Sequence, residues 1–246
     1  MSNKIRLGIL GGGGDSLIGV VHRIASNMFD RFQLVGGCFN PNIEDNNSFA
    51  ERIGIPLNRV YSSFDVLIEE ELKLPKEQRM EVISVLTPNF LHFPMAKKLL
   101  ENGFNVICEK PLTTTYAEAL ELGAIQKEKQ AVFAVTYTYT GYPMVRQMKD
   151  MIRRGVLGTI QKVDLQYYQG WINPVIHEPE ERSKVWRLDP EKGGLSCCIG
   201  DIGTHAFDML EYVTGMEVKQ LLADLNTLYP DNSLDVDGTV LIRMSE

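Results

Sequence analysis

The sequence predicts an α/β protein: a doubly wound parallel sheet, followed by a smaller α+β domain with an open mixed or antiparallel sheet. The first observation is that apolar runs of strand length alternate with helical patterns over residues 1–140. The second is a run of four glycines between the first apolar run and the first helical pattern. The third is a change of rhythm after residue 140, where helices become fewer. We therefore expect one domain over residues 1–140 and a second over residues 141–246.

Six apolar runs predict the strands of the first domain, and helical patterns separate them. The strands are expected at residues 4–10, 32–39, a short stretch near 60, 81–88, 105–111 and 131–139. The helices are expected at residues 17–28, 47–54, 64–72, 93–103 and 113–129. Thr115 and Glu118 have the spacing of a capping box at the start of the last helix. Strands joined through helices in this way pair in parallel, with right-handed crossovers.

The second domain has two predicted helices and three predicted strands. The helices are expected at residues 142–158 and 200–215, and the strands at residues 160–171, 219–229 and 237–244. Because the sequence stops directly after a predicted strand, we expect it to be truncated, with part of this sheet missing.

Composition excludes several classes of function. The formal net charge is −7 and no long basic run occurs, which argues against a nucleic-acid partner. No apolar stretch is long enough for a signal peptide or a membrane span. The four cysteines lack zinc-ribbon spacing, so we expect reduced thiols in a cytoplasmic protein. Apart from Asp201 and His205, no histidine pairs with an acid at ligand-like spacing, and we expect no metal.

The unusual residue groups of the first domain follow its predicted strands. They are residues 11–15, 39–40, 87–89 and 109–111. Parallel α/β sheets bind ligands at the carboxyl ends of their strands. This shared placement predicts a ligand site better than any single group does.

The glycine run, Gly11 to Gly14, completes no G-x-G-x-x-G pattern, because the third position falls on Ser16 or Leu17. A strand before it and a helix after it are nevertheless the context of a nucleotide loop. The alternative is a mobile glycine-rich turn, and a P-loop is excluded because no Gly-Lys-Ser/Thr follows. Asp15 and Ser16 lie where an N-cap is expected, so the helix can start at Leu17. The residues expected to hold a dinucleotide here are Gly11, Gly13, Gly14, Leu17 and Ile18.

The choice between NAD and NADP stays open. An acidic residue usually binds the ribose at the end of the second strand, whereas this sequence has Cys38-Phe39-Asn40 there. Asn40 can hydrogen-bond a ribose, so it is a further cofactor-binding candidate.

Residues 85–119, "VLTPNFLHFPMAKKLLENGFNVICEKPLTTTYAEA", closely resemble the glucose–fructose oxidoreductase/inositol dehydrogenase family (Gfo/Idh/MocA). Residues 193–215, "GGLSCCIGDIGTHAFDMLEYVTG", resemble a second motif of the same family, so the resemblance spans essentially the whole chain. It implies a Rossmann domain followed by an α/β domain that binds substrate and often mediates oligomers. A homo-oligomer, dimer or tetramer, is therefore expected. Members extend well beyond this endpoint, which agrees with a truncated second sheet.

The resemblance also gives the glycine loop a register. Members commonly carry a histidine three residues after the last fingerprint glycine, and Gly19 with His22 matches that spacing. Gly19 then takes the place of the third glycine, after a longer turn. The resemblance further implies that Thr87, Pro88, Asn89 and His92 line the cofactor crevice.

Oxidation of a secondary alcohol needs a hydride acceptor, which NAD(P) supplies, and a base for the hydroxyl proton. Lys110, between Glu109 and Pro111, would by itself be read as a solvated charge. The resemblance instead assigns Lys110 to the nicotinamide and the reacting hydroxyl, with Glu109 beside the cofactor.

Asp201 and His205 are four residues apart at a helix start, so they share one face. In isolation they would be read as a capping aspartate beside a buried histidine. With the Glu-Lys-Pro motif present, His205 is the expected general base, because imidazole accepts protons near neutrality. Lys110 would tune or relay the proton, and Asp201 would orient His205 or hold a substrate hydroxyl. Asp208 is expected to be structural.

Substrate contacts are expected from Tyr139, Trp186 and Arg187. Tyr139 follows the sixth strand, close to a position where many members have asparagine, so this sequence departs from the family pattern there. A tryptophan can stack on a sugar ring, and Arg187 can bind hydroxyls or a carboxylate. Loop anchoring and a surface ion pair are the competing interpretation.

The sequence thus predicts an NAD(P)-dependent oxidoreductase. It would transfer a hydride between a secondary alcohol of a small polyol, sugar or cyclitol and the nicotinamide, with no nucleic-acid or membrane partner. The alternative is a non-catalytic protein that binds a dinucleotide as a sensor or scaffold.

Overall fold

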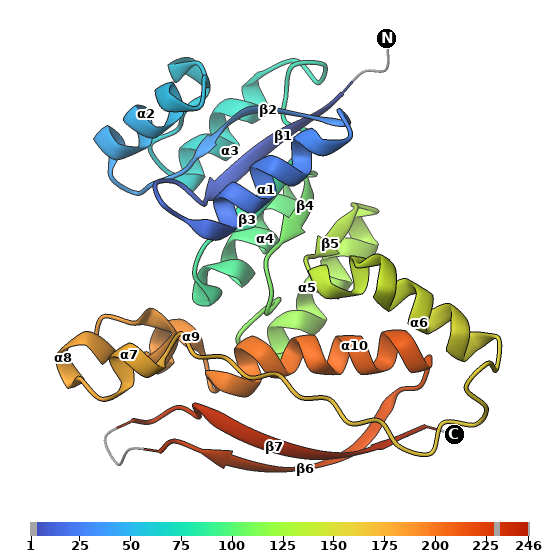
Figure 1. Cartoon of the computed structure of the whole chain (residues 1–246). Helices are drawn as coiled ribbons and strands as arrows, with labels where there is room; N and C mark the ends of the chain where they lie inside the picture. Colours follow the sequence, from blue (N-terminus) through green and yellow to red (C-terminus); the bar gives the residue numbers. More distant parts are fainter. Residues whose placement is uncertain (1–3, 229–231, 246) are drawn as a thin grey trace. The chain divides into compact units, whose positions relative to one another are not determined.

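A computed structural model of the chain describes residues 4–228 and 232–245 (Figure 1). The chain divides into two compact units, Met1–Thr136 and Tyr137–Glu246, here called the N-terminal and C-terminal units. No helix among the described residues is long and apolar enough to cross a membrane.

The N-terminal unit contains a five-stranded parallel sheet with the order β2-β1-β3-β4-β5 (Figure 1). This confirms the doubly wound parallel sheet. The short strand expected near residue 60 is reduced to an isolated bridge between Val60 and Gly37. The strands are β1 (Ile5–Gly11), β2 (Phe32–Cys38), β3 (Val82–Leu86), β4 (Asn105–Cys108) and β5 (Phe133–Val135).

Two apolar clusters cover the two faces of this sheet, because successive strand residues point to opposite faces. Ile9 and Leu86 belong to one cluster, and Leu10 and Val85 belong to the other. The first cluster is closed by α1 (Leu17–Met28) and α2 (Ile43–Arg52). The second is closed by α3 (Phe64–Lys73), α4 (His92–Glu101) and α5 (Tyr116–Lys129).

The strand order reverses between β1 and β3, because the chain leaves β1 for β2 on one side and returns to β3 on the other. Such a switch point opens a crevice at the carboxyl ends of the two strands. The glycine loop follows β1, and Thr87 follows β3. Two 3₁₀ turns, η1 (Leu57–Arg59) and η2 (Asn89–Leu91), complete the unit.

Of the two cap candidates at the start of α1, Asp15 and Ser16, the structure selects Ser16, and the predicted capping box of α5 is confirmed. The Ser16 hydroxyl accepts a hydrogen bond from the Gly19 N–H at 3.2 Å, and α1 starts at Leu17. Thr115 and Glu118 form the complete capping box at the start of α5.

In the C-terminal unit, α10 (Thr204–Thr214) packs against α6 (Pro143–Arg153), and two antiparallel strands, β6 (Val218–Asn226) and β7 (Asp237–Met244), form the sheet. The antiparallel part of the prediction is thereby confirmed. Residue 229 of the expected strand 219–229 lies outside the described residues. The remaining elements are η3 (Thr138–Gly141), α7 (Asn173–Ile176), α8 (Pro179–Arg182), η4 (Trp186–Leu188), α9 (Pro190–Gly193) and the π-helical turn η5 (Ile199–Gly203).

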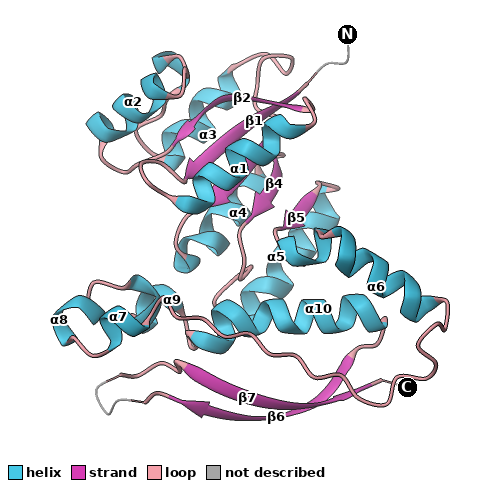
Figure 2. Cartoon of the chain, viewed as in Figure 1, coloured by secondary structure: helices cyan, strands magenta, loops and turns pink. Residues whose placement is uncertain are grey.

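The strand predicted at residues 160–171 is wrong, because that segment forms no strand (Figure 2). Its alternation gives it no buried face: residues 161–170 are all exposed, and the apolar Val163 and Leu165 among them are 40% and 42% exposed. No described strand pairs with its backbone, and a strand needs such a partner as well as the pattern. The preceding helix is also shorter than predicted and ends at Arg153, before two glycines with positive φ, Gly155 and Gly158.

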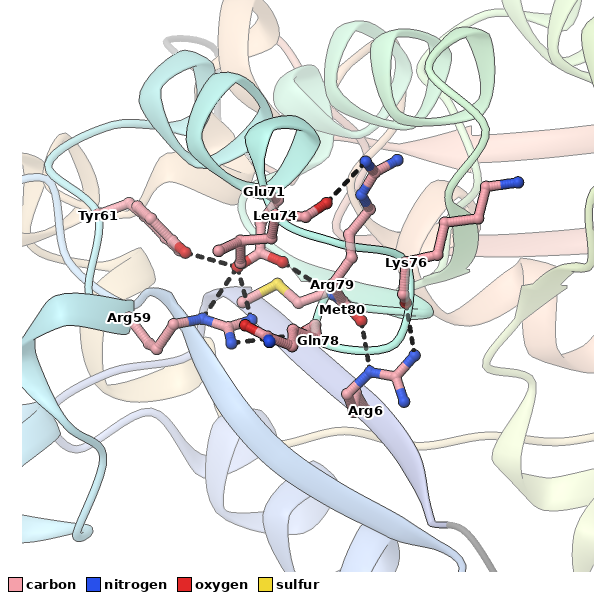
Figure 3. A network of polar contacts seen from close by, with 9 residues as sticks. All are labelled: Arg6, Arg59, Tyr61, Glu71, Leu74, Lys76, Gln78, Arg79 and Met80. Atoms are coloured by element: carbon pink, nitrogen blue, oxygen red, sulfur yellow. Dashed lines mark hydrogen bonds and ion pairs between the residues drawn. The ribbon is translucent and has the colours of Figure 1, made fainter.

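A buried carboxylate ties α3 to the edge of the N-terminal sheet (Figure 3). Glu71 of α3 is 0% exposed, and its Oε1 accepts hydrogen bonds from Arg59 Nη2 at 2.7 Å and from the Tyr61 hydroxyl. Its Oε2 accepts one from the Met80 N–H at 2.8 Å. Burial and the hydrogen bond to Glu71 raise the pKa of Tyr61. Both oxygens of this buried charge therefore have donors.

We expect Glu71→Ala to lower the free energy of unfolding by about 3–5 kcal/mol, because it leaves Arg59 Nε and Nη2 and the Met80 N–H without their acceptor. Urea unfolding measures this effect. The matched control is Glu70→Ala, one residue away, whose side chain is 48% exposed and pairs with Lys73. It should change the free energy by less than about 1 kcal/mol. Equal midpoints for the two variants would contradict this account.

Candidate active site

The glycine loop between β1 and α1 has a backbone that other residues cannot easily adopt. Gly11, Gly12 and Gly14 have φ of 79°, 67° and 58°, in the left-handed region. A Cβ on Gly13 would lie 2.6 Å from the Phe39 carbonyl oxygen, and nothing lies within 4 Å of one on Gly14. The loop is therefore packed against the end of β2 on one side and open at Gly14.

Gly19, in the first turn of α1, makes the closest approach. A Cβ there would lie 1.9 Å from the Gly12 carbonyl oxygen, so the helix packs backbone to backbone on the loop. This is the role of the third glycine of a dinucleotide fingerprint. Arg23 of the same helix donates to the same Gly12 carbonyl at 3.0 Å and so also ties α1 to the loop.

In the first turn of α1, Leu17 is 79% exposed, whereas Ile18 packs on the apolar cluster that contains Ile9 and Leu86. Helix N-terminal N–H groups lack intrahelical partners and carry partial positive charge. A glycine loop that leads into such a helix start fits a pyrophosphate.

The segment after β3 is held by a buried histidine. His92 is 1% exposed, and its Nε2 and Nδ1 lie 2.9 Å from the Thr87 carbonyl and 2.7 Å from the Pro111 carbonyl. Burial lowers the pKa of His92. His92 thus joins the carboxyl end of β3 to the segment that follows Lys110. Asn89, between Pro88 and the start of α4, is also buried.

Glu109, at the carboxyl end of β4, is 8% exposed and accepts from two side chains on other elements. His22 Nε2 of α1 lies 2.8 Å from its Oε1, and the Thr136 hydroxyl also bonds to that oxygen. Burial alone would raise the pKa of Glu109, but the bonds from His22 and Thr136 and the charge of Lys110 lower it. The half-buried Lys110 follows directly, and its peptide bond to Pro111 is cis.

The end of β2 is fixed by Asn46, which is 0% exposed. Its Oδ1 accepts from the N–H groups of Phe39 at 2.8 Å and Asn40 at 3.3 Å, and its Nδ2 donates to the Tyr61 carbonyl at 2.8 Å. The Asn40 side-chain oxygen accepts from the Asn42 N–H at 2.9 Å. The predicted cofactor residues of the N-terminal unit therefore lie in the glycine loop, in the first turn of α1 or just after the carboxyl ends of β2, β3 and β4, and His92 lies at the start of α4.

In the C-terminal unit, Asp201 lies in η5 and His205 in the first turn of α10. His205 is 7% exposed. Its ring lies 4.5 Å from the ring of Tyr139, centroid to centroid, and 5.8 Å from that of Tyr137. The Tyr139 hydroxyl lies 2.6 Å from the Tyr167 hydroxyl, and this bond, together with burial, raises the pKa of Tyr139 to about 12. The structure thus brings Tyr139 and His205 together.

Arg187 connects the predicted substrate residues to Asp201. Its Nε lies 3.6 Å from Asp201 Oδ2, and its guanidinium carbon lies 4.4 Å from the centroid of the Trp186 ring. The same carbon lies 5.8 Å from the Trp171 ring. Part of the Trp186 ring is therefore covered by Arg187. Asp208 lies farther along α10, where burial and the Glu211 charge raise its pKa.

A pocket of about 130 Å³ lies beside Asp201 within the C-terminal unit. Aromatic side chains, the adjacent cysteines and two carboxylates line it: Tyr167, Tyr168, Trp171, Cys197, Cys198, Asp201 and Asp237. Aromatic faces beside hydroxyl-accepting carboxylates suit a polyhydroxylated ring. Burial, helped by nearby carboxylates, raises the pKa of Cys197 to about 12 and that of Cys198 to about 11. Both thiols are therefore protonated at neutral pH and are poor nucleophiles.

Among the described residues, no group of three or more His, Cys, Asp or Glu side chains could hold a metal ion. The sequence-based reasoning missed several residues that shape these sites: Arg23, Asn46, Thr136 and Tyr167. Arg23, Thr136 and Tyr167 each contact a residue at least eleven positions away in the sequence. Asn46 contacts Phe39 and Asn40, which are seven and six positions away. An asparagine in an amphipathic helix gives no sequence signal of such a role.

Two family models match this chain. Residues 5–137 match the GFO/IDH/MocA model described as "Oxidoreductase family, NAD-binding Rossmann fold". Residues 145–246 match the GFO/IDH/MocA C-terminal domain.

Individual proteins are also similar. The chain is 36% identical over 226 residues to the uncharacterized oxidoreductase YfiI of Bacillus subtilis (strain 168), covering 91% of this chain and 57% of that protein. An inositol dehydrogenase homolog of Azotobacter vinelandii, solved with NAD+, has a TM-score of 0.92 and 33% identity, covering 99% of this chain and 62% of that one. Its structure with NADH and myo-inositol has a TM-score of 0.88 and 31% identity, covering 100% and 62%. This chain therefore spans less than two thirds of the length of these relatives.

Proposed function

This chain belongs to the GFO/IDH/MocA oxidoreductase family, and on that premise we propose that it is a dehydrogenase acting on CH–OH donors. It transfers a hydride between a secondary alcohol of a sugar, a cyclitol or a sugar derivative and the nicotinamide. The observation that carries the proposal is a buried His205 one turn from Asp201, since dinucleotide binding alone needs no proton-transfer group.

The N-terminal unit is an NAD-binding Rossmann domain, and its residues fit the cofactor. Bound NAD+ supplies the hydride acceptor. The glycine loop and the start of α1 hold the pyrophosphate, and Asn40 holds a ribose through its amide N–H₂, because its oxygen is already engaged. The other cofactor residues proposed are Thr87, Pro88, Asn89, His92, Glu109 and Lys110.

Proton transfer is assigned to three side chains. His205 accepts the hydroxyl proton of the alcohol as the carbonyl forms. Asp201 orients His205 or holds a neighbouring hydroxyl of the substrate, and Arg187 holds Asp201 in turn. Lys110 contacts the reacting oxygen and relays or tunes the proton.

Substrate recognition is assigned to the C-terminal unit. Tyr139 lies against His205, and Trp186 and Arg187 lie beside Asp201. The related inositol dehydrogenase homolog binds myo-inositol together with NADH, which supports a polyol substrate for this chain.

The test is NAD+ reduction, followed by absorbance, with inositols, neutral sugars and sugar acids. We expect at least one of them to drive NADH formation. Lys110→Ala should lower kcat by about 10²-fold or more while NADH still binds. If Lys110→Ala is as fast as the parent protein, the role given to Lys110 is wrong. If no compound of the panel is oxidised while NADH binds, a non-catalytic dinucleotide sensor replaces the enzyme.

A further inference from the structure

A buried carboxylate from the far end of the sequence reaches the segment that carries Asp201 and His205. Asp235 lies two residues before β7, and it is 4% exposed. Its Oδ1 accepts from the Cys197 N–H at 3.1 Å, and its Oδ2 accepts from the Ile199 N–H at 2.8 Å. Its backbone carbonyl accepts from the Cys198 N–H at 2.9 Å. Three successive N–H groups therefore depend on this one residue.

These N–H groups stand where the helical segment η5–α10 begins. The first N–H groups of a helix have no partner within it and carry partial positive charge, which a carboxylate stabilises. The residue at the capping position of η5, Cys198, makes no side-chain cap bond. The next N–H, of Gly200, is taken by the Ser196 hydroxyl at 2.7 Å. The start of the segment is thus held by Asp235 from 36 to 38 residues away.

Asp235 is itself fixed by its neighbours. Leu234, 4% exposed, belongs to the apolar cluster of Ile176, Leu188 and Cys197, and Val236 packs against the same cluster. Both neighbours of Asp235 and Cys197, whose N–H the carboxylate caps, therefore pack in the same cluster.

The helical register of η5 determines how Asp201 is oriented relative to His205. Asp201 lies in a π-helical turn and His205 in the α-helix that continues from it. A π turn contains one residue more than an α turn, and such turns are rare because the α register competes with them. Relaxation of η5 to the α register would rotate Asp201 by about 100° relative to His205.

We infer that Asp235 is a positioning residue, which fixes the register of η5 and thereby the relative orientation of Asp201 and His205. Its effect on catalysis rests on the proposed function, and its effect on η5 does not. Asp235 touches no reacting atom in this account.

The test compares Asp235→Asn with a matched control, Asn232→Ala. The asparagine amide keeps one acceptor but presents a donor to the second N–H. Asn232 is buried in the same connection and donates to the Thr227 and Leu234 carbonyls, but no bond of its side chain reaches η5 among the described contacts.

We expect Asp235→Asn to lower kcat about 10²-fold, with KM for NAD+ unchanged, because a misplaced group of this kind costs about that factor. Asn232→Ala should change kcat by less than about 3-fold even if it lowers Tm as much.

Hydrogen exchange separates this inference from the proposed function. In Asp235→Asn, the amides of residues 197–201 should exchange faster, while those of the last turn of α10 keep their rate. This outcome would support the anchor even if the parent protein oxidised no alcohol. Should Asp235→Asn not fold, Ser196→Ala removes the acceptor of the Gly200 N–H alone and should cause a smaller change of the same kind. Unchanged exchange over residues 197–201, or equal losses of kcat in Asp235→Asn and Asn232→Ala, would overturn the inference.

Discussion

Replacement of His205 by glutamine should lower kcat for alcohol oxidation by about 10²–10⁴-fold, with little change in the KM for NAD+. Glutamine keeps the size and hydrogen-bonding capacity of the side chain but cannot accept a proton near neutrality. The buried ring of His205, held 4.5 Å from the Tyr139 ring, should be replaced without loss of the fold. Steady-state kinetics with the best alcohol of the panel measures the effect.

The matched control for this variant is His177→Gln. His177 is an exposed histidine of the same unit, just after α7, and plays no part in the proposed chemistry. The kcat of His177→Gln should stay within about 2-fold of the parent value. The assignment of His205 as general base fails if His205→Gln is no slower than His177→Gln.

Gly19→Ala should remove most of the affinity for NADH and also destabilise the N-terminal unit. The new Cβ would lie 1.9 Å from the Gly12 carbonyl oxygen and 2.6 Å from its carbon, so either α1 or the glycine loop must move. Overpacking of this kind costs about 1–3 kcal/mol. If the binding free energy of NADH falls by the same amount as the overpacking cost, NADH binding weakens by about 5–150-fold. Fluorescence titration with NADH and urea unfolding measure the two effects.

Gly123→Ala provides the control for this substitution. Gly123 lies in α5, and nothing lies within 4 Å of a Cβ placed there. Alanine is the better helix former, so this variant should be as stable as the parent or more stable by up to about 1 kcal/mol. If Gly19→Ala binds NADH as tightly as Gly123→Ala, the packing role of Gly19 is wrong.

The residues at the strand ends could be predicted from the sequence because their signals are local. A parallel sheet requires buried strands separated by helices, and this rhythm alone puts Gly11, Thr87 and Glu109 at carboxyl ends. The capping residues Ser16 and Thr115 are local signals as well. The displaced third glycine needed the family resemblance to be recognised.

Long-range contacts could not be predicted in this way. Glu69, Glu70 and Glu71 are consecutive, and only the positions of Arg59 and Met80 in space make Glu71 the buried one. The helical spacing that identifies α1 includes Val21 and Met28, yet these are 42% and 67% exposed. Gly19 and Ser26 are buried instead, because α1 lies close to the backbone below it.

The strand prediction for residues 160–171 is wrong for the same reason. Alternation describes one chain, whereas a strand requires a second chain segment to pair with it. Asp235 likewise gave no sequence signal, since its partners lie 36 and 38 residues earlier.

The measurement that tests the central claim most directly is the origin of the hydrogen in the reduced cofactor. The protein is incubated with NAD+ and myo-inositol that is deuterated on its carbon atoms, and the NADH formed is examined by mass spectrometry. Hydride transfer from a secondary alcohol predicts one deuterium in each NADH. NADH without deuterium, or binding of NADH with no reduction of NAD+ by any polyol tested, would contradict the account.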